Sequence, residues 1–146
     1  MKVLIALDDS PHSEAALEFV RRVRWPGGSR VTVVSVVETA ANPAAMALGA
    51  KFTARVLDDF KKQRQEMVAR AQCRLRESGL STDGHVLAGD AREALIAWAE
   101  REHTDLIVVG SRGHTGLAKL LLGSVSSCVV THAACSVLVV KQGSPQ

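Results

Sequence analysis

The chain has 146 residues, of which 47% are hydrophobic and 23% are charged, with a formal net charge of +3. This composition excludes a disordered chain, because enough apolar surface is available to offset the entropy cost of folding. Aromatic residues make up only 3%, which argues against a platform that stacks single-stranded nucleic acid on aromatic rings. We expect one domain over residues 1–146, with an aliphatic core.

The chain offers no sign of membrane insertion, export or metal binding. No apolar run approaches the ~20 residues of a membrane span, and the opening run at residues 3–7 is too short for a signal peptide. Cys73, Cys128 and Cys135 form no CxxC pair, and the five histidines are scattered. We therefore expect a cytoplasmic protein without a metal site, whose three thiols are buried or half-buried.

The first predicted element is a strand at residues 3–7, a continuous apolar run typical of a strand covered on both faces. Ser10 follows as a predicted helix N-cap and Pro11 as the first helical residue. Apolar residues at helical spacing continue until the segment Trp25–Gly28 ends this helix. Residues 31–37, rich in β-branched side chains, predict the second strand.

Residues 38–49 predict a loop, which either covers a site or is a loose surface segment. A long helix is expected at roughly residues 52–77. Eight basic and four acidic residues lie between positions 51 and 77. A solvated face with the pairs Asp58–Lys62 and Glu66–Arg70 accounts for them, and a helix that attracts polyanions is the alternative.

The second half of the chain continues the alternation of strands and helices. Strands are expected at residues 85–88, 106–109 and 136–141. Asp90 is a predicted N-cap with Glu93 at the capping-box position, and Ser124 is a predicted cap of a helix that ends at His132. The pattern predicts an α/β fold with a parallel sheet and helices on both of its faces.

A glycine-rich connection, residues 110–123, follows the fourth strand at the edge where open parallel sheets bind ligands. Gly110 and Gly113 let backbone amides approach an anion and adopt positive φ, and Gly123 opens a helix whose first N–H groups are unpaired. The hydroxyls of Ser124 and Ser126 and the guanidinium of Arg112 add donors. The segment indicates a phosphate site, and the alternative is an ordinary strand-to-helix turn, because it matches neither a Walker A loop nor GxGxxG.

Asp8 and Asp9 end the first strand on the expected ligand side. Asp8 either accepts hydrogen bonds from ribose hydroxyls or caps the first helix together with Ser10, and the two roles are compatible. Asp9 is a candidate for helping to hold a divalent cation.

These residues resemble the universal stress protein family over nearly the whole chain. The resemblance lies in residues 3–8 with Ser10 and Ser13, and in the blocks 105–113, 121–126 and 135–140. The ATP-binding branch of that family carries G-x2-G-x9-G-[ST], which here corresponds to Gly110, Gly113, Gly123 and Ser124. The resemblance implies a Rossmann-like domain of the adenine nucleotide alpha hydrolase-like kind, with five parallel strands in the order 3-2-1-4-5.

The resemblance also implies a set of nucleotide contacts. Asp8 would meet the ribose, and the backbone near Val36 would meet adenine. The residues implied around the phosphates of ATP are Gly110, Arg112, Gly113, Gly123, Ser124 and Ser126, and the site is expected to include Ala6, Leu7 and Val125. Asp9 stands where the family commonly has glycine, which would weaken binding or favour a nucleotide bridged by a metal such as Mg²⁺.

The fifth strand would lie at an edge of that sheet, yet Val137–Val140 is uniformly apolar. Bare apolar edges invite pairing, so we expect a homodimer through this strand, as the resemblance also implies. The favoured function is an ATP-binding regulatory protein of the stress response with no assigned catalytic residue. The alternatives are a slow ATPase or phosphotransferase, for which His114 is the candidate catalytic residue, and a nucleotide-free chaperone-like dimer. Nucleic-acid binding through helix 52–77 is not favoured.

Overall fold

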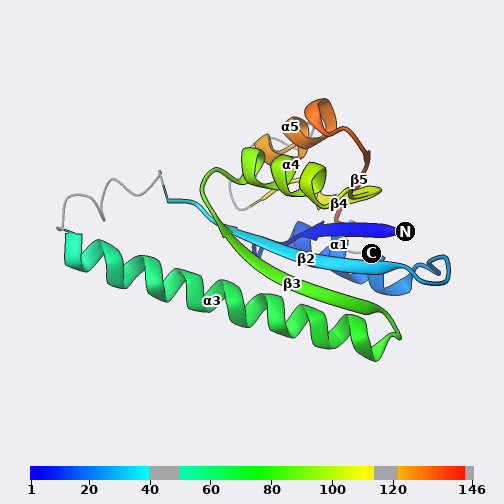
Figure 1. Cartoon of the computed structure of the whole chain (residues 1–146), viewed down its shortest axis with the longest axis horizontal. Coiled ribbons are helices and arrows are strands. Elements are labelled where there is room, and N and C mark those ends of the chain that lie inside the picture. The colour runs from blue at the N-terminus through cyan, green and yellow to red at the C-terminus, as the bar shows by residue number, and fades with distance from the viewer. Residues whose placement is uncertain (40–49, 114–121, 144–146) are drawn as a thin grey trace.

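A computed structural model describes residues 1–39, 50–113 and 122–143 of the chain. Its five strands form one parallel sheet in the order β3-β2-β1-β4-β5, as expected (Figure 1). The strands are β1 (Lys2–Ala6), β2 (Arg30–Val37), β3 (Ser81–Ala88), β4 (Leu106–Gly110) and β5 (Ser136–Val140). The helices are α1 (Pro11–Arg22), α3 (Ala50–Glu77), α4 (Ala91–Arg101) and α5 (Ser124–His132).

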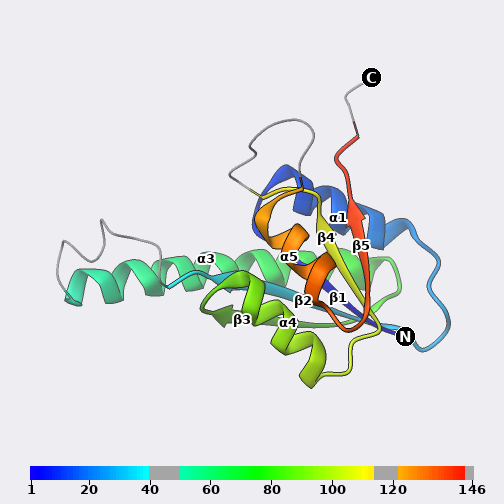
Figure 2. The ribbon, with the colours of Figure 1, turned by 90° about the horizontal axis from the view of Figure 1, so that it is seen from above.

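The helices cover both faces of the sheet, α1 and α3 on one and α4 and α5 on the other (Figure 2). Alternate residues of β1 feed the two cores: Val3 and Ile5 pack with α1 and α3, whereas Leu4 packs with α4 and α5. Both cores are almost entirely aliphatic, as the low aromatic content predicts. The apolar runs of the sequence are therefore strands buried on both faces.

The predicted helix starts at Ser10 and Asp90 are confirmed. The Ser10 hydroxyl accepts a hydrogen bond from the Ser13 amide at 3.1 Å, and Pro11 is the first residue of α1. The Asp90 carboxylate accepts from the amides of Arg92 and Glu93, although the returning bond of a capping box is not seen among the described residues. The prediction for α5 is one residue off, because Gly123 is the N-cap and Ser124 the first helical residue.

Helix α3 is much longer than the strands it covers. Its 28 residues span about 42 Å, whereas the eight residues of β3 span about 26 Å. Its buried residues in the described part, Val68, Ala71 and Leu75, all lie in the C-terminal half. The N-terminal half projects beyond the sheet, and its Phe60 is 44% exposed (Figure 1).

Other expectations are corrected. The third strand begins at Ser81 rather than at residue 85, because its polar residues Ser81–Gly84 pair in register with β2. Neither Asp58–Lys62 nor Glu66–Arg70 closes to ion-pair distance in the described chain, so the charges of α3 are mostly solvated.

Two further expectations concern the three thiols and the segments that follow β2 and β4. The expectation of buried or half-buried thiols is wrong for Cys73, which is exposed, and is confirmed for Cys128 and Cys135. Burial raises the pKa of the Cys135 thiol. The expected loop at residues 38–49 and the candidate His114 fall mainly or wholly outside the described residues. No helix in the described ranges has both the length and the apolar composition that a membrane span requires.

Candidate functional site

The candidate site lies where the direction of chain connection reverses. Strands β1 and β4 are neighbours, with Ile5 aligned to Val108. The chain leaves β1 toward α1 on one face of the sheet and leaves β4 toward α5 on the opposite face (Figure 2). The two loops therefore diverge from a shared corner, which is where doubly wound parallel sheets bind ligands.

Asp8 has one carboxylate oxygen in the turn and the other directed at the glycine-rich connection. Its Oδ1 accepts a hydrogen bond from the Ser10 amide at 3.0 Å, and its own amide donates to the Ser13 hydroxyl at 3.4 Å. A Cβ placed on Gly113 would lie 2.6 Å from Asp8 Oδ2. Asp8 thus shapes the start of α1, as expected, and borders the glycine-rich connection, whereas its expected contact with ribose stays a prediction.

The two halves of the motif, Gly110 with Gly113 and Gly123 with Ser124, come together at this corner. The Gly123 amide donates to the Ser111 carbonyl at 2.8 Å. A Cβ on Gly123 would lie 3.1 Å from the Cα of Arg112 and 3.4 Å from the amide nitrogen of Gly113. The backbone after β4 and the backbone before α5 are therefore in close contact, so their amide groups can surround one small anion.

The expected reason for the glycines is partly wrong. Gly110, Gly113 and Gly123 do not have positive φ; among the described glycines that conformation belongs to Gly28, Gly79 and Gly89. Gly110 is needed for close approach instead, because a Cβ there would lie 2.6 Å from the carbonyl carbon of His12. Steric room, rather than a left-handed backbone, explains the glycines of the site.

The start of α5 presents unpaired donors. Gly123 provides no side-chain cap, so the amides of Ser124, Val125 and Ser126 have no intrahelical acceptor. The helix dipole adds about half a positive charge at this end. Ser124 is exposed, but Ser126 is buried and its hydroxyl donates to the Gly110 carbonyl at 2.7 Å. The Ser126 hydroxyl therefore holds the loop in place, and only its amide is left for an anion.

The remaining predicted site residues lie around the same edge. The Leu7 amide donates to the Val34 carbonyl, and the Leu7 carbonyl accepts from the Ser35 hydroxyl at 2.7 Å. Ala6, Val36 and Val125 are half-buried on the face of α4 and α5, and Arg112 is partly exposed beside Gly113. The structure thus places all eleven predicted residues at or near the carboxyl edge of β1, β2 and β4.

Two features of the corner were missed from the sequence. His12 Nδ1 lies 3.3 Å from the Ser111 hydroxyl, so α1 contacts the loop after β4 directly. Asp9 has a φ of +67°, a left-handed conformation that costs most residues roughly 1–2 kcal/mol but is tolerated by aspartate. The glycine that the family commonly has at that position was the sequence signal for this conformation.

No group of three potential metal ligands occurs among the described residues.

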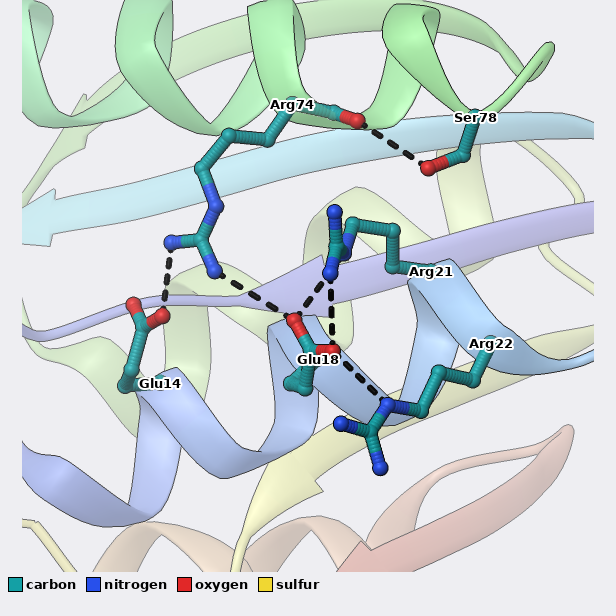
Figure 3. A network of polar contacts seen from close by, with 6 residues as sticks. All are labelled: Glu14, Glu18, Arg21, Arg22, Arg74 and Ser78. Atoms are coloured by element: carbon teal, nitrogen blue, oxygen red, sulfur yellow. Dashed lines mark hydrogen bonds and ion pairs between the residues drawn. The ribbon is translucent and has the colours of Figure 1, made fainter.

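Helices α1 and α3 are joined beside this corner by a charged network (Figure 3). Arg74 of α3 reaches Glu14 at 2.6 Å and Glu18 at 3.5 Å. Glu18 also pairs with Arg21 and Arg22, and these guanidinium groups lower the pKa of its carboxyl to about 2. The network ties the helix that follows β1 to the long helix on the same face.

The chain is similar to known proteins over nearly its whole length. The model of the universal stress protein family matches residues 1–141. Universal stress protein MJ0531 of Methanocaldococcus jannaschii is 30% identical over 142 residues, which cover 97% of this chain and 82% of the relative. The solved structure of hypothetical protein MJ0577 superposes with a TM-score of 0.85 at 25% identity, covering 99% of this chain and 97% of that one.

A universal stress protein family protein of Arabidopsis thaliana, crystallised with AMP bound, has the same fold. Its TM-score is 0.68 at 20% identity, with 99% of this chain and 93% of the other covered.

Proposed function

Because the chain belongs to the universal stress protein family, we propose that it binds an adenine nucleotide, ATP, at the corner between β1 and β4. Binding rather than turnover is its function: nucleotide occupancy alters the loops of the corner and so regulates a stress-response partner. The AMP found in the relative from Arabidopsis thaliana supports a nucleotide of this class.

The observation that carries this proposal is the convergence of Gly113, Gly123 and the uncapped start of α5. Clustered amides and a helix N-terminus together favour a phosphate group, and the exposed Ser124 hydroxyl adds a donor. Arg112, in the same loop, supplies a guanidinium for the terminal phosphate. The G-x2-G-x9-G-[ST] spacing of these residues is the pattern of the ATP-binding branch and therefore also supports ATP.

The rest of the nucleotide follows along the sheet edge. Asp8, at the end of β1, would accept from the ribose with its carboxylate, which also holds the Ser10 amide through Oδ1. Adenine meets the backbone near Val36, with Ala6, Leu7 and Val125 close to the nucleotide. Any Mg²⁺ arrives with ATP and is held chiefly by its phosphates and water, because no ready cage of carboxylates occurs in the described residues.

The test compares two glycine substitutions by isothermal titration with ATP and AMP. Gly113→Ala places a methyl 2.6 Å from Asp8 Oδ2 and displaces that carboxylate, so affinity should fall at least about tenfold. Gly27→Ala is the matched control, because nothing lies within 4 Å of its added Cβ. Equal affinities of Gly113→Ala and wild type, or no heat with wild type at millimolar nucleotide, would contradict the proposal.

We also propose a homodimer through β5, which supports the regulatory role. Strand β5 is the edge of the sheet, and its apolar residues Val137–Val140 are only half-buried. The Val140 carbonyl accepts from the Ser111 amide on the side of β4, so by alternation the Val139 backbone faces the open edge. A second copy pairing there would complete the ladder.

Analytical ultracentrifugation of Val139→Pro tests the dimer. The substitution removes an N–H from the open edge and leaves the Val140 bond to β4 in place, so we expect a folded monomer. A dimer that persists in Val139→Pro, or a wild-type monomer at tens of micromolar, would show that β5 is not the interface.

A further inference from the structure

A pocket separate from the nucleotide corner lies between α1 and α3. Its volume is about 330 Å³, and its floor is formed by the apolar side chains Leu7, Leu17, Met67 and Ala71. Helices α1 and α3 lie on one face of the sheet, whereas the uncapped start of α5 lies on the other. The pocket is therefore not the phosphate site, although both border the loop after β1.

Part of the pocket is lined by charged side chains that already pair with each other. Arg74 and Glu14 both line it and are joined at 2.6 Å, and Arg74 also reaches Glu18 (Figure 3). The Ser10 and Ser13 hydroxyls face the same pocket but are engaged at the start of α1: Ser10 Oγ accepts from the Ser13 amide, and Ser13 Oγ donates to the Ser10 carbonyl. These groups shape the pocket wall, and because they are bonded to one another, recognition of a ligand falls to other side chains.

Two opposite charges on the walls are not neutralised. Asp9 from the loop after β1 and Arg70 from α3 line the pocket, and neither takes part in an ion pair within the part of the chain that the structure describes. Both side chains are exposed. Because the backbone of Asp9 is left-handed, the direction in which its side chain projects from the main chain is fixed.

We propose that this pocket binds a small zwitterion with an aliphatic body, such as an amino acid. Its ammonium group would pair with Asp9, its carboxylate with Arg70, and its apolar part would pack on Met67 and the rest of the floor. A simple anion or cation would leave one wall charge unpaired, and an inorganic ion would not use the floor. The volume is at the small end of ligand pockets, roughly 300–1,000 Å³, which suits a molecule of this size.

The binding test uses the methyl group of Met67 as a reporter. Protein labelled with ¹³C at methionine methyls is titrated with leucine, 4-aminobutyrate and 6-aminohexanoate, which separate the two charges by different lengths. Hexanoate and hexylamine each carry only one of the charges. The Met67 signal is assigned from its loss in Met67→Leu. We expect saturable shifts of this signal with at least one zwitterion, and binding about tenfold weaker for the singly charged compounds.

Charge-neutralising variants distinguish recognition from packing. Asp9→Asn, which tolerates the left-handed backbone, and Arg70→Gln should each weaken zwitterion binding about tenfold. Asp58→Asn and Arg55→Gln, exposed charges of α3 that do not line the pocket, should leave it unchanged. Gly113→Ala should also bind zwitterions normally, so failure of this proposal is distinct from failure of the nucleotide proposal.

Two results would overturn the proposal. The first is the absence of any saturable shift of the Met67 signal at tens of millimolar of all three zwitterions. The second is binding that is equally strong in Asp9→Asn and Arg70→Gln, since contact with the apolar floor alone would then explain it.

Discussion

Replacing Gly110 with alanine should destabilise the fold, because this glycine allows β4 and α1 to meet. The added Cβ would lie 2.6 Å from the carbonyl carbon of His12 and 2.7 Å from its oxygen. To reach an ordinary contact of 3.4 Å, the backbone at the start of α1 must move by roughly 0.8 Å. That movement is opposed by Ala16, Leu17 and Val20, which anchor α1 in the core.

The size of the effect follows from two opposing terms. Overpacking of this kind costs about 1–3 kcal/mol, and the smaller conformational freedom of alanine in the unfolded chain returns about 0.4–1 kcal/mol. We expect a net loss of about 1–2 kcal/mol in the free energy of unfolding. With a urea m-value of about 2 kcal/mol/M, the midpoint should fall by roughly 0.5–1 M.

Urea unfolding followed by tryptophan fluorescence and by far-UV circular dichroism measures this loss. Gly27→Ala is the control, since its Cβ would meet no atom within 4 Å, and it should stay within about 0.5 kcal/mol of wild type. A midpoint of Gly110→Ala equal to that of Gly27→Ala would refute the claim that close approach, and not local conformation, requires this glycine.

Three further substitutions test other parts of the structure. Glu18→Gln should lower the melting temperature above pH 4.5, and its difference from wild type should shrink as pH falls toward 2, because the stabilisation from the depressed pKa of Glu18 is complete above its unfolded value of 4.5 and is lost as the folded carboxyl becomes protonated near 2; a pH-independent difference would contradict this. Asp90→Ala should lower the melting temperature by a few degrees through loss of the α4 cap, measured by calorimetry with exposed Asp59→Ala as control. Ser126→Ala should cost about 1–2 kcal/mol in urea unfolding, because the buried Gly110 carbonyl loses its donor, whereas Ser124→Ala at an exposed position should cost little.

The sequence predicts most of the fold because its signals are local. Continuous apolar runs mark the strands, and Ser10, Pro11 and Asp90 mark helix starts through contacts with residues two or three positions away. The start of β3 was missed because Ser81–Gly84 is polar, and only its pairing with β2 makes it a strand. The strand order came from resemblance, since apolar runs do not encode which strands are neighbours.

The site was predictable in its residues but not in its contacts. The spacing of the glycine motif identified Gly113 and Gly123 as candidate site residues, but their proximity depends on how β4 and α5 pack. The engaged hydroxyl of Ser126 and the contact of His12 with Ser111 join residues far apart in the chain. The pocket between α1 and α3 is even harder to predict from the sequence, because its walls come from residues about 60 positions apart and no motif links them.

The length of α3 divides one continuous helix into two parts of unequal stability. Residues near Leu75 are shielded by the sheet and should exchange their amide hydrogens only when the whole domain unfolds. Residues near Phe60 rest on their own helical hydrogen bonds and can fray while the sheet stays intact. Changes in the length or charge of that projecting end should therefore have little effect on the aliphatic core.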